Sequence, residues 1–266
     1  MLVPGVVSEA PVTARCTSVK PTFQLASPET GTTYWIFVHS PDPIREPGPW
    51  PVMFFMDGDN QFAAGEKAYR RARDGGTIPP LLLVGVGYGA GYGQSTNRRG
   101  RDYTPTPHTD EPISGGADAF MNFLATTLWS DLARRYPVND GARGIAGHSL
   151  GSLLVLYALF QPRPFFTHHL ASAPSIWWAD RAILGHVQRL RARQSSLPAK
   201  LYLGVGANDS GSMRGDLALL EAQLAAHPFA GLAVTSEQFP QRDHYDAIDA
   251  TFPAGLTALF GPPSLR

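Results

Sequence analysis

Residues 144–151 read Gly-Ile-Ala-Gly-His-Ser-Leu-Gly, and this stretch decides the fold. Its first three residues are small or apolar and indicate a buried strand, whereas residues 150–160 form an uninterrupted run that is typical of a buried helix. That run ends before Pro162, because a proline cannot continue the hydrogen bonds of a helix. The stretch therefore predicts a strand, a tight turn and a helix, with Ser149 at the turn.

Ser149 is the candidate nucleophile. Residues 147–151 match Gly-x-Ser-x-Gly, the nucleophile elbow of α/β hydrolases, in which the glycines let the strand and the helix approach closely. A five-residue pattern carries little weight by itself in a chain with 27 glycines, but here a strand pattern precedes it and a helix pattern follows. The alternative is a serine that only caps the helix after a glycine turn.

The rest of the chain alternates short β-type runs with longer helical runs. We expect strands at residues 33–39, 51–56, 81–86, 143–146, 168–171, 200–205 and 232–237, and helices at 61–73, 117–136, 150–160, 180–194, 213–227 and 245–260. This order is typical of an α/β protein with a mostly parallel, doubly wound sheet and helices on both faces. The 266 residues fit one α/β-hydrolase domain over 1–266, with an irregular N-terminal arm at 1–20.

Composition narrows the class of partner. The 22 Lys and Arg balance the 22 Asp and Glu, and no basic run occurs, so we expect no nucleic acid partner. The single cysteine, Cys16, cannot form an internal disulfide or a cysteine metal cage. Residues 1–20 carry no basic start followed by an apolar run, and the longest apolar stretch is far below the roughly 20 residues of a membrane span. The sequence predicts a cytoplasmic protein with no membrane partner, and a secreted enzyme without disulfides stays open.

A serine hydroxyl needs an imidazole to take its proton and an acceptor to fix the tautomer of that imidazole. In this fold the partners follow the serine in the order acid, then histidine. His244 lies in the loop between the last predicted strand and the final predicted helix, where a base can reach the carboxyl edge of the sheet. The other histidines after Ser149 begin a strand or lie on or at the end of a helix: His168, His169, His186 and His227. We expect His244 to be the base, against the alternative of an ordinary surface histidine.

Asp209 is the best candidate for the acid, because it directly follows the predicted strand at 200–205 and so lies at the same sheet edge. A Ser/His pair without an acid is one alternative. The second alternative is that another carboxylate is the acid, and the candidates are Asp180, Asp216, Glu221 and Asp243.

Ester attack creates an oxyanion that N–H groups must stabilise. One donor is the N–H of Leu150, and the second is expected in the loop after the strand at 51–56, at Asp57 or Gly58, since glycine permits the backbone angles that aim an N–H inward. The aspartates of this loop could instead begin a calcium site, but the second half of such a loop, with its glutamate, is absent from the sequence. We therefore expect no metal and no cofactor.

Residues 87–116 form a long segment rich in Gly, Pro, Tyr and Arg, without the period of a helix or a strand. Loops of this length inside a compact domain are usually either functional or a sign that elements were assigned wrongly. The first reading is favoured, because this loop follows a predicted strand at the ligand edge of the sheet. We expect an active-site loop in which Arg98, Arg99 or Arg101 binds an anionic group by a forked contact. The alternative is a surface wrap whose arginines are solvated or paired with Asp102 and Asp110.

Aromatic residues are expected to line the same pocket. Tyr88 and Tyr92 lie in the loop, and Trp177 and Trp178 follow the predicted strand at 168–171. Most small-molecule sites have such an apolar lining. Core packing is the alternative for the tryptophans.

Four blocks of sequence together resemble the esterase D-like α/β hydrolases, and among them the siderophore esterase branch with the enterobactin and bacillibactin trilactone esterases. The blocks are residues 81–88 (Leu-Leu-Leu-Val-Gly-Val-Gly-Tyr), 101–107 (Arg-Asp-Tyr-Thr-Pro-Thr-Pro), 147–151 and 171–178 (Ala-Ser-Ala-Pro-Ser-Ile-Trp-Trp). The resemblance spans about residues 20–260 and implies that Ser149 is the nucleophile and His244 the base, with Asp57, Gly58 and Leu150 on the oxyanion side. Ser152 departs from the family, which usually has a second glycine there. The position of the acid varies within the branch, so the resemblance leaves Asp209 open.

These features predict a serine hydrolase that cleaves a carboxylic ester or lactone of a small molecule through an acyl-enzyme intermediate. An acyltransferase or thioesterase would use the same residues on an ester or thioester, and a non-catalytic binding protein of the same fold is the third alternative. The sequence identifies neither the acyl group nor the oligomeric state.

Overall fold

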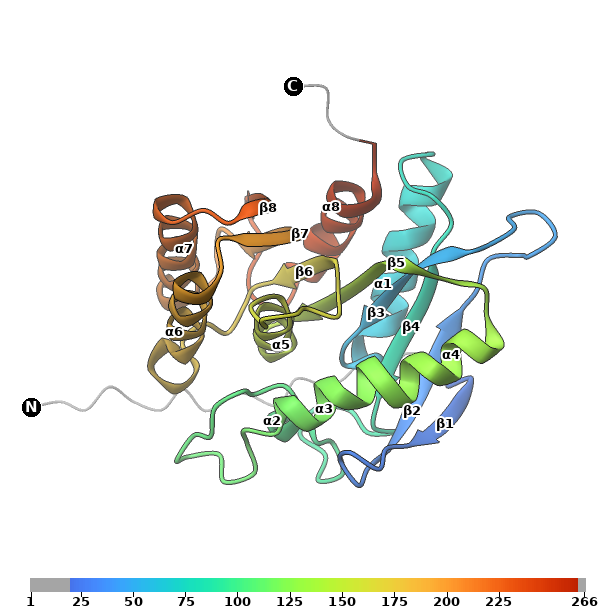
Figure 1. Ribbon diagram of the computed structural model, residues 1–266, viewed down its shortest axis with the longest axis horizontal. Helices are drawn as coiled ribbons and strands as arrows, with labels where there is room; N and C mark the ends of the chain where they lie inside the picture. The colour runs from blue at the N-terminus through green and yellow to red at the C-terminus, as the bar shows by residue number, and fades with distance from the viewer. Residues whose placement is uncertain (1–19, 263–266) are drawn as a thin grey trace, which may run out of the picture.

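The computed structural model describes residues 20–262, whose strands form a single sheet (Figure 1). The strand order is β1-β2-β4-β3-β5-β6-β7-β8. The strands are β1 (Phe23–Ala26), β2 (Thr33–His39), β3 (Trp50–Phe55), β4 (Leu82–Gly87), β5 (Val138–His148), β6 (His168–Ser172), β7 (Ser196–Gly206) and β8 (Ala230–Phe239). The pairs β1·β2 and β2·β4 are antiparallel and all the others are parallel. The predicted arm at 1–20 lies, except for Lys20, outside the described residues.

The helices cover both faces of this sheet. They are α1 (Gly58–Asp74), α2 (Arg99–Asp102), α3 (Ala117–Phe123), the π-helix η1 (Leu124–Leu128), α4 (Trp129–Arg135), α5 (Leu150–Leu159), α6 (Trp178–Arg193), α7 (Gly211–Ala226) and α8 (Ile248–Phe260). Helices α1 and α8 pack on one face, and α3 to α7 pack on the other (Figure 1). Between residues 20 and 262 no helix is both long and apolar enough for a bilayer crossing. The predicted fold class, an α/β-hydrolase fold with a mostly parallel sheet, is confirmed.

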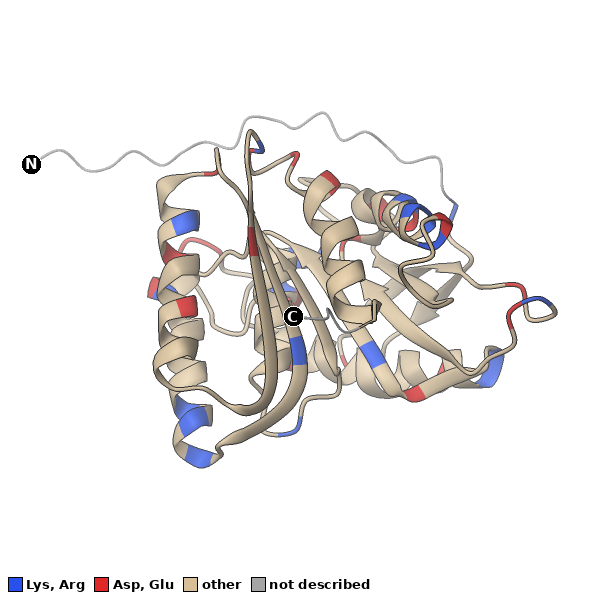
Figure 2. Cartoon of the chain, turned by 90° about the horizontal axis from the view of Figure 1, so that it is seen from above, with Lys and Arg blue, Asp and Glu red and all other residues tan. Residues whose placement is uncertain are grey.

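Two apolar clusters hold the layers together. Successive side chains of a strand point to opposite faces of the sheet. In β3, Phe54 therefore packs in the cluster under α3 to α7, whereas the adjacent Phe55 packs in the cluster under α1 and α8. Figure 2 shows Lys and Arg intermixed with Asp and Glu along the chain, mostly on helices and in loops.

Most elements differ from the prediction in their bounds, as β5 does, which spans Val138–His148 where 143–146 was expected, and three features differ in kind. Strand β1 was not expected, because it is four residues long and alternates between half-buried and exposed positions at the sheet edge. The expected loop at 87–116 contains the single turn α2. The expected helix at 117–136 is continuous in direction but passes through η1, a widened turn between α3 and α4.

The topology brings the ends of the parallel strands to one edge. Strands β3, β5, β6, β7 and β8 run in the same direction, so the residues that follow them meet at the carboxyl edge of the sheet. These following residues include Asp57, Ser149, Ser175, Asp209 and His244. The candidate site is built there, as expected for an open α/β sheet.

Candidate active site

Ser149 occupies the sharp turn between β5 and α5. Its backbone has φ 56° and ψ −119°, which a residue with a side chain rarely adopts. The Ser149 N–H donates to the carbonyl of Ser172 at 2.9 Å, and this bond to β6 holds the turn in place. A Cβ atom on Gly147 would lie 2.3 Å from the carbonyl carbon of Gly151, so the strand and the helix can meet this closely only with glycine at 147.

Ser152, the departure from the family pattern, is fully buried and fastens the same turn. Its Oγ lies 2.6 Å from the carbonyl oxygen of Gly147 and 2.7 Å from that of Ser172. The hydroxyl therefore ties the first turn of α5 to β5 and β6. A small polar residue is accommodated where the family usually has glycine.

Three residues from three loops of the carboxyl edge form one chain of hydrogen bonds, which we call the serine row: Ser149, His244 and Asp209. His244 Nε2 lies 3.0 Å from Ser149 Oγ, and His244 Nδ1 lies 2.9 Å from Asp209 Oδ2. The Asp209 carboxylate is buried, and its other oxygen accepts the N–H of Ser210 at 2.7 Å. The competing carboxylate Asp216 is instead bound to Arg181 at 2.6 Å.

This row has the geometry for proton transfer. A carboxylate can only accept, so the bond with Asp209 fixes the His244 proton on Nδ1 and leaves the lone pair of Nε2 facing the serine hydroxyl. Nε2 can then take the Ser149 proton, and Asp209 can stabilise the imidazolium that results.

Two further residues touch this row, and the sequence analysis did not identify either as functional. Ser175 is buried and its Oγ lies 3.3 Å from Ser149 Oγ. Because Ser149 gives its proton toward His244, Ser175 is the donor in this contact. His148 is buried with its ring centroid 4.8 Å from that of His244. The available signals were the position of Ser175 after β6 and of His148 inside the Gly-x-Ser-x-Gly pattern.

Two helix N-termini lie at the oxyanion side. Leu150 and Gly58 are the first residues of α5 and α1, and the first N–H groups of a helix have no acceptor within it. Gly58 packs tightly, since a Cβ there would lie 2.9 Å from the carbonyl carbon of Val86. The expectation for Asp57 is corrected, because its N–H already donates to Tyr103 Oη at 2.8 Å.

Asp57 uses its buried side chain in an ion pair with the partly buried Arg99. Arg99 Nε and Nη2 donate to the two carboxylate oxygens at 2.9 and 3.1 Å. A Cβ on Gly151 would lie 3.3 Å from Asp57 Oδ2, so the pair lies beside the elbow. Burial opposes the charge on Arg99, but the Asp57 carboxylate outweighs it and raises the pKa of Arg99. The Arg99 guanidinium stacks 4.8 Å from the centroid of the Tyr92 ring.

Other predicted binding residues divide into two groups. Tyr88 is buried and Arg101 is partly buried, and both donate to the buried carboxylate of Asp102, at 3.1 and 2.7 Å. Tyr34 of β2 donates to the same carboxylate at 2.8 Å, so these contacts hold the base of the loop against β2. Trp178 is likewise buried and donates its indole N–H to the Thr106 carbonyl at 2.8 Å.

The side chains of the second group are partly exposed to solvent. Arg98 is partly exposed at the start of α2, and the Arg99 side chain is 23% exposed. Trp177 is 46% exposed and directly precedes α6. These three residues remain the candidates for contact with a ligand.

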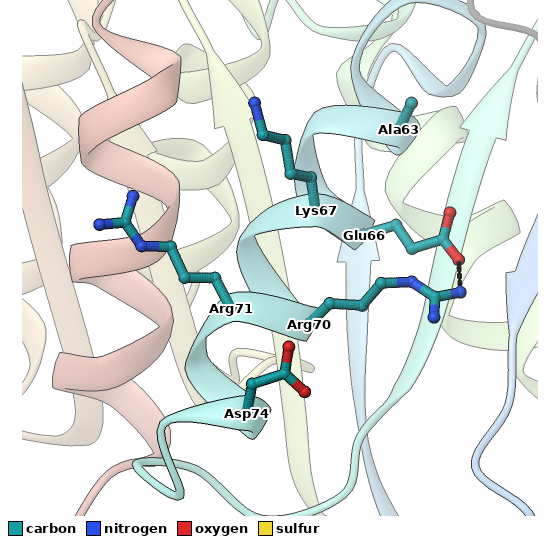
Figure 3. A pocket seen from close by; sticks show the side chains of 6 residues that line it. All are labelled: Ala63, Glu66, Lys67, Arg70, Arg71 and Asp74. Atoms are coloured by element: carbon teal, nitrogen blue, oxygen red, sulfur yellow. Dashed lines mark hydrogen bonds and ion pairs between the residues drawn. The ribbon is translucent and has the colours of Figure 1, made fainter.

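A hollow of about 430 Å³ lies on α1, and Figure 3 draws the side chains that line it. Its lining residues all belong to α1, and they are Ala63, Glu66, Lys67, Arg70, Arg71 and Asp74. Arg70 is paired with Glu66 at 2.7 Å, and the lining includes neither Ser149 nor His244. This hollow is therefore separate from the serine row.

Within residues 20–262, no group of three or more His, Cys, Asp or Glu side chains lies close enough together to hold a metal ion.

Comparison with known proteins places the chain in a family. The profile of the esterase family, described as "Putative esterase", matches residues 27–248. The siderophore triacetylfusarinine C esterase of Aspergillus fumigatus is 36% identical over 151 residues, which are 55% of this chain and 51% of that protein. The ferri-bacillibactin esterase BesA of Bacillus subtilis is 29% identical over 198 residues, 68% of each chain. The match thus spans about half of the first relative and about two thirds of the second.

Among solved structures, the BES protein of Bacillus cereus superposes with a TM-score of 0.79 at 24% identity, over 96% of this chain and 98% of that one. At this identity the likeness concerns the fold, and it agrees with the sheet and helix layers described above. The family profile covers most of the chain, including the elbow and the loop of His244. The chain therefore belongs to the esterase family.

Proposed function

We propose that the protein is a serine esterase that cleaves a carboxylic ester or lactone of a small molecule through an acyl-enzyme. One observation carries this proposal: His244 lies 3.0 Å from Ser149 Oγ through one ring nitrogen and 2.9 Å from Asp209 through the other. A nucleophile, a base and a group that orients the base are the parts that acyl transfer to serine requires.

The relatives support a class of substrate. One is named as an esterase of triacetylfusarinine C, a siderophore, and the other as an esterase of ferri-bacillibactin. We extend this to the chain as a siderophore ester or lactone. Arg98 would bind an anionic group of that substrate and Trp177 would contact an apolar part of it, because these side chains keep exposed surface. Arg99 would add only its Nη1, because its Nε and Nη2 are held by Asp57.

In the first half of the reaction, Ser149 Oγ attacks the ester carbonyl carbon while His244 Nε2 takes the hydroxyl proton. The negative charge that develops on the carbonyl oxygen is stabilised by the N–H groups of Leu150 and Gly58. The tetrahedral intermediate then breaks its bond to the alcohol oxygen, and His244 returns the proton to that oxygen. The alcohol leaves and the acyl group stays on Ser149.

In the second half, a water molecule attacks the acyl-enzyme and gives its proton to His244. The bond between the acyl carbon and Ser149 Oγ breaks, and His244 returns the proton to the serine. Asp209 accepts from His244 Nδ1 and stabilises the imidazolium in both halves. The products are one carboxylic acid and one alcohol for each ester bond cleaved.

The experiment compares hydrolysis of a nitrophenyl ester by the wild type, Ser149→Ala and the control Ser196→Ala, which changes an exposed serine at the start of β7. Ser149→Ala should lower kcat at least about 10³-fold, because only the oxyanion donors and substrate binding remain. The control should keep full activity. If Ser149→Ala retained more than about a tenth of the activity, the proposal would be wrong. Preferred acyl transfer to an added alcohol over water would instead indicate an acyltransferase.

A further inference from the structure

Asp57 lies between β3 and α1, immediately before Gly58, whose N–H is on the oxyanion side of the site. The Asp57 backbone has φ 54° and ψ 47°, the left-handed conformation. Because the peptide bond is planar, the ψ angle of Asp57 sets the direction in which the Gly58 N–H points. A residue with a side chain keeps the left-handed conformation only where the surrounding contacts hold it. The direction of this donor therefore depends on what holds Asp57.

The short helix α2 holds Asp57 at two points. Arg99, the first residue of α2, donates from Nε and Nη2 to the two carboxylate oxygens at 2.9 and 3.1 Å. Tyr103 directly follows the helix, and its Oη accepts the Asp57 N–H at 2.8 Å. Residues four apart lie on the same side of a helical turn. One turn of the loop at 87–116 thus binds both the side chain and the backbone of Asp57.

The remaining contacts tie Asp57 to the two helices of the oxyanion side. Its carbonyl accepts the N–H groups of Asn60 and Gln61, in the first turn of α1, at 2.9 and 2.8 Å. Its Oδ2 lies 3.3 Å from where a Cβ on Gly151 would be, so the carboxylate packs against the first turn of α5. That turn begins with Leu150, which carries the other N–H of the oxyanion side. The carboxylate that Arg99 binds therefore lies between the two donors.

A forked contact suits this task better than a single hydrogen bond. Two parallel N–H donors fix the plane of a carboxylate, whereas a point charge leaves it free to rotate. The Asp57 side chain is fully buried, so without its cation it would have to move or find another partner. The guanidinium of Arg99 is itself held by two rings, with its central carbon 4.8 Å from the ring centroid of Tyr92 and 5.6 Å from that of Tyr103.

We propose that Arg99 is a positioning residue that acts through the Asp57 carboxylate: the ion pair fixes the peptide that carries the Gly58 N–H and so orients this donor toward the oxyanion. The inference rests on the proposed function, in which an oxyanion forms when Ser149 attacks the ester. The loop at 87–116 then contributes to the chemical step itself, in addition to any contact with the substrate.

A double-mutant cycle tests the proposal on a neutral nitrophenyl ester, which has no anionic group for an arginine to bind. Its members are Arg99→Gln, Asp57→Asn and the double variant, and asparagine also tolerates the left-handed backbone of residue 57. Each single change should lower kcat about 10- to 100-fold, less than the loss of a whole oxyanion donor, and change KM less than about 2-fold. The double variant should lose no more than a single one, because both changes break the same ion pair.

Arg99→Lys separates the forked contact from the charge. A lysine keeps the positive charge beside Asp57 but cannot donate to both oxygens in one plane, so its kcat should fall almost as far as that of Arg99→Gln. All kcat values are expressed per site labelled to completion by a fluorophosphonate, so that unfolded protein is not counted. The matched control is Arg181→Gln, which breaks the bond of another arginine to a buried aspartate, Asp216, and should keep kcat.

Three results would overturn the positioning role. They are a kcat of Arg99→Gln within about 3-fold of the wild type, losses that multiply in the double variant, and an effect confined to KM for the nitrophenyl monoester of succinic acid, which carries a carboxylate. Ser149→Ala is measured alongside. If it abolishes turnover while the Arg99 variants keep kcat, only the positioning role fails, and if it stays active, the proposed function itself is wrong.

Discussion

At the scale of single residues, the two ring nitrogens of His244 have different partners, and the chemistry depends on this difference. In Asp209→Asn, the amide N–H would face Nδ1 and favour the tautomer with its proton on Nε2, which cannot accept the Ser149 proton. We expect kcat to fall about 10³- to 10⁴-fold with little change in stability. Steady-state hydrolysis of a nitrophenyl ester measures the effect.

The matched control is Asp216→Asn, which changes a buried aspartate that is bound to Arg181 and not to His244. It should keep kcat close to that of the wild type. An Asp209→Asn variant with kcat within about tenfold of the wild type would remove Asp209 from the mechanism and leave a Ser149–His244 pair.

The residues of the serine row could be predicted because each one follows a strand, and strand ends at a parallel edge converge. His148 and Ser175 could not be predicted in the same way, since their contacts depend on side-chain directions across neighbouring strands. The error at Asp57 has a similar cause. Its N–H donates a hydrogen bond to the hydroxyl of Tyr103, which is 46 residues away in the sequence. No local sequence pattern predicts a partner at that distance.

At the scale of elements, the turn between β5 and α5 depends on the absence of a side chain at residue 147. A Cβ on Gly147 would lie 2.3 Å from the carbonyl carbon of Gly151, and that carbon belongs to the backbone, which cannot move aside as a flexible side chain could. Gly147→Ala should therefore lower the free energy of unfolding by about 1–3 kcal/mol, the usual cost of overpacking, and displace Ser149 enough to abolish activity. Urea unfolding and ester hydrolysis measure the two effects.

Gly211→Ala is the control, because a Cβ on this first residue of α7 meets nothing within 4 Å. It should be neutral or slightly stabilising. A Gly147→Ala protein as stable and active as Gly211→Ala would show that the turn can relax without cost.

The elements themselves were predictable where their period is strong. Strand β2 has the predicted bounds, Thr33–His39, because a continuous run of β-branched and aromatic residues lies between Gly31 and Pro41. Strand β1 and the single turn α2 are four residues each, too short to show a period. The widening at η1 leaves the apolar helix pattern intact, so the sequence of 117–136 still reads as one helix.

At the scale of the whole molecule, buried histidines make stability depend on pH. Burial lowers the pKa of His169 to about 3. The unfolded chain binds this proton near pH 6.5, so between about pH 6.5 and pH 3 unfolding takes up a proton and the free energy of unfolding falls as the pH drops. The contribution of His169 is therefore complete above pH 6.5 and is lost on acidification, by about 1.4 kcal/mol per pH unit at most.

Replacing this residue isolates the effect from other titrating groups. His169→Gln should reduce the slope of the free energy of unfolding against pH between about pH 6 and 4.5, by up to the slope of one proton. Urea titrations at several pH values give both slopes. Identical slopes in the wild type and the variant would mean that His169 is protonated in the folded protein.

The central claim is that Ser149 is the residue that becomes acylated, and covalent labelling tests it most directly. The protein is treated with a fluorophosphonate, digested, and analysed by peptide mass spectrometry with and without Asp209→Asn. We predict one adduct on Ser149, formed far more slowly in Asp209→Asn, with loss of ester hydrolysis in proportion to labelling. An adduct on the adjacent Ser175, or full hydrolysis by a protein that carries no adduct on Ser149, would contradict the account.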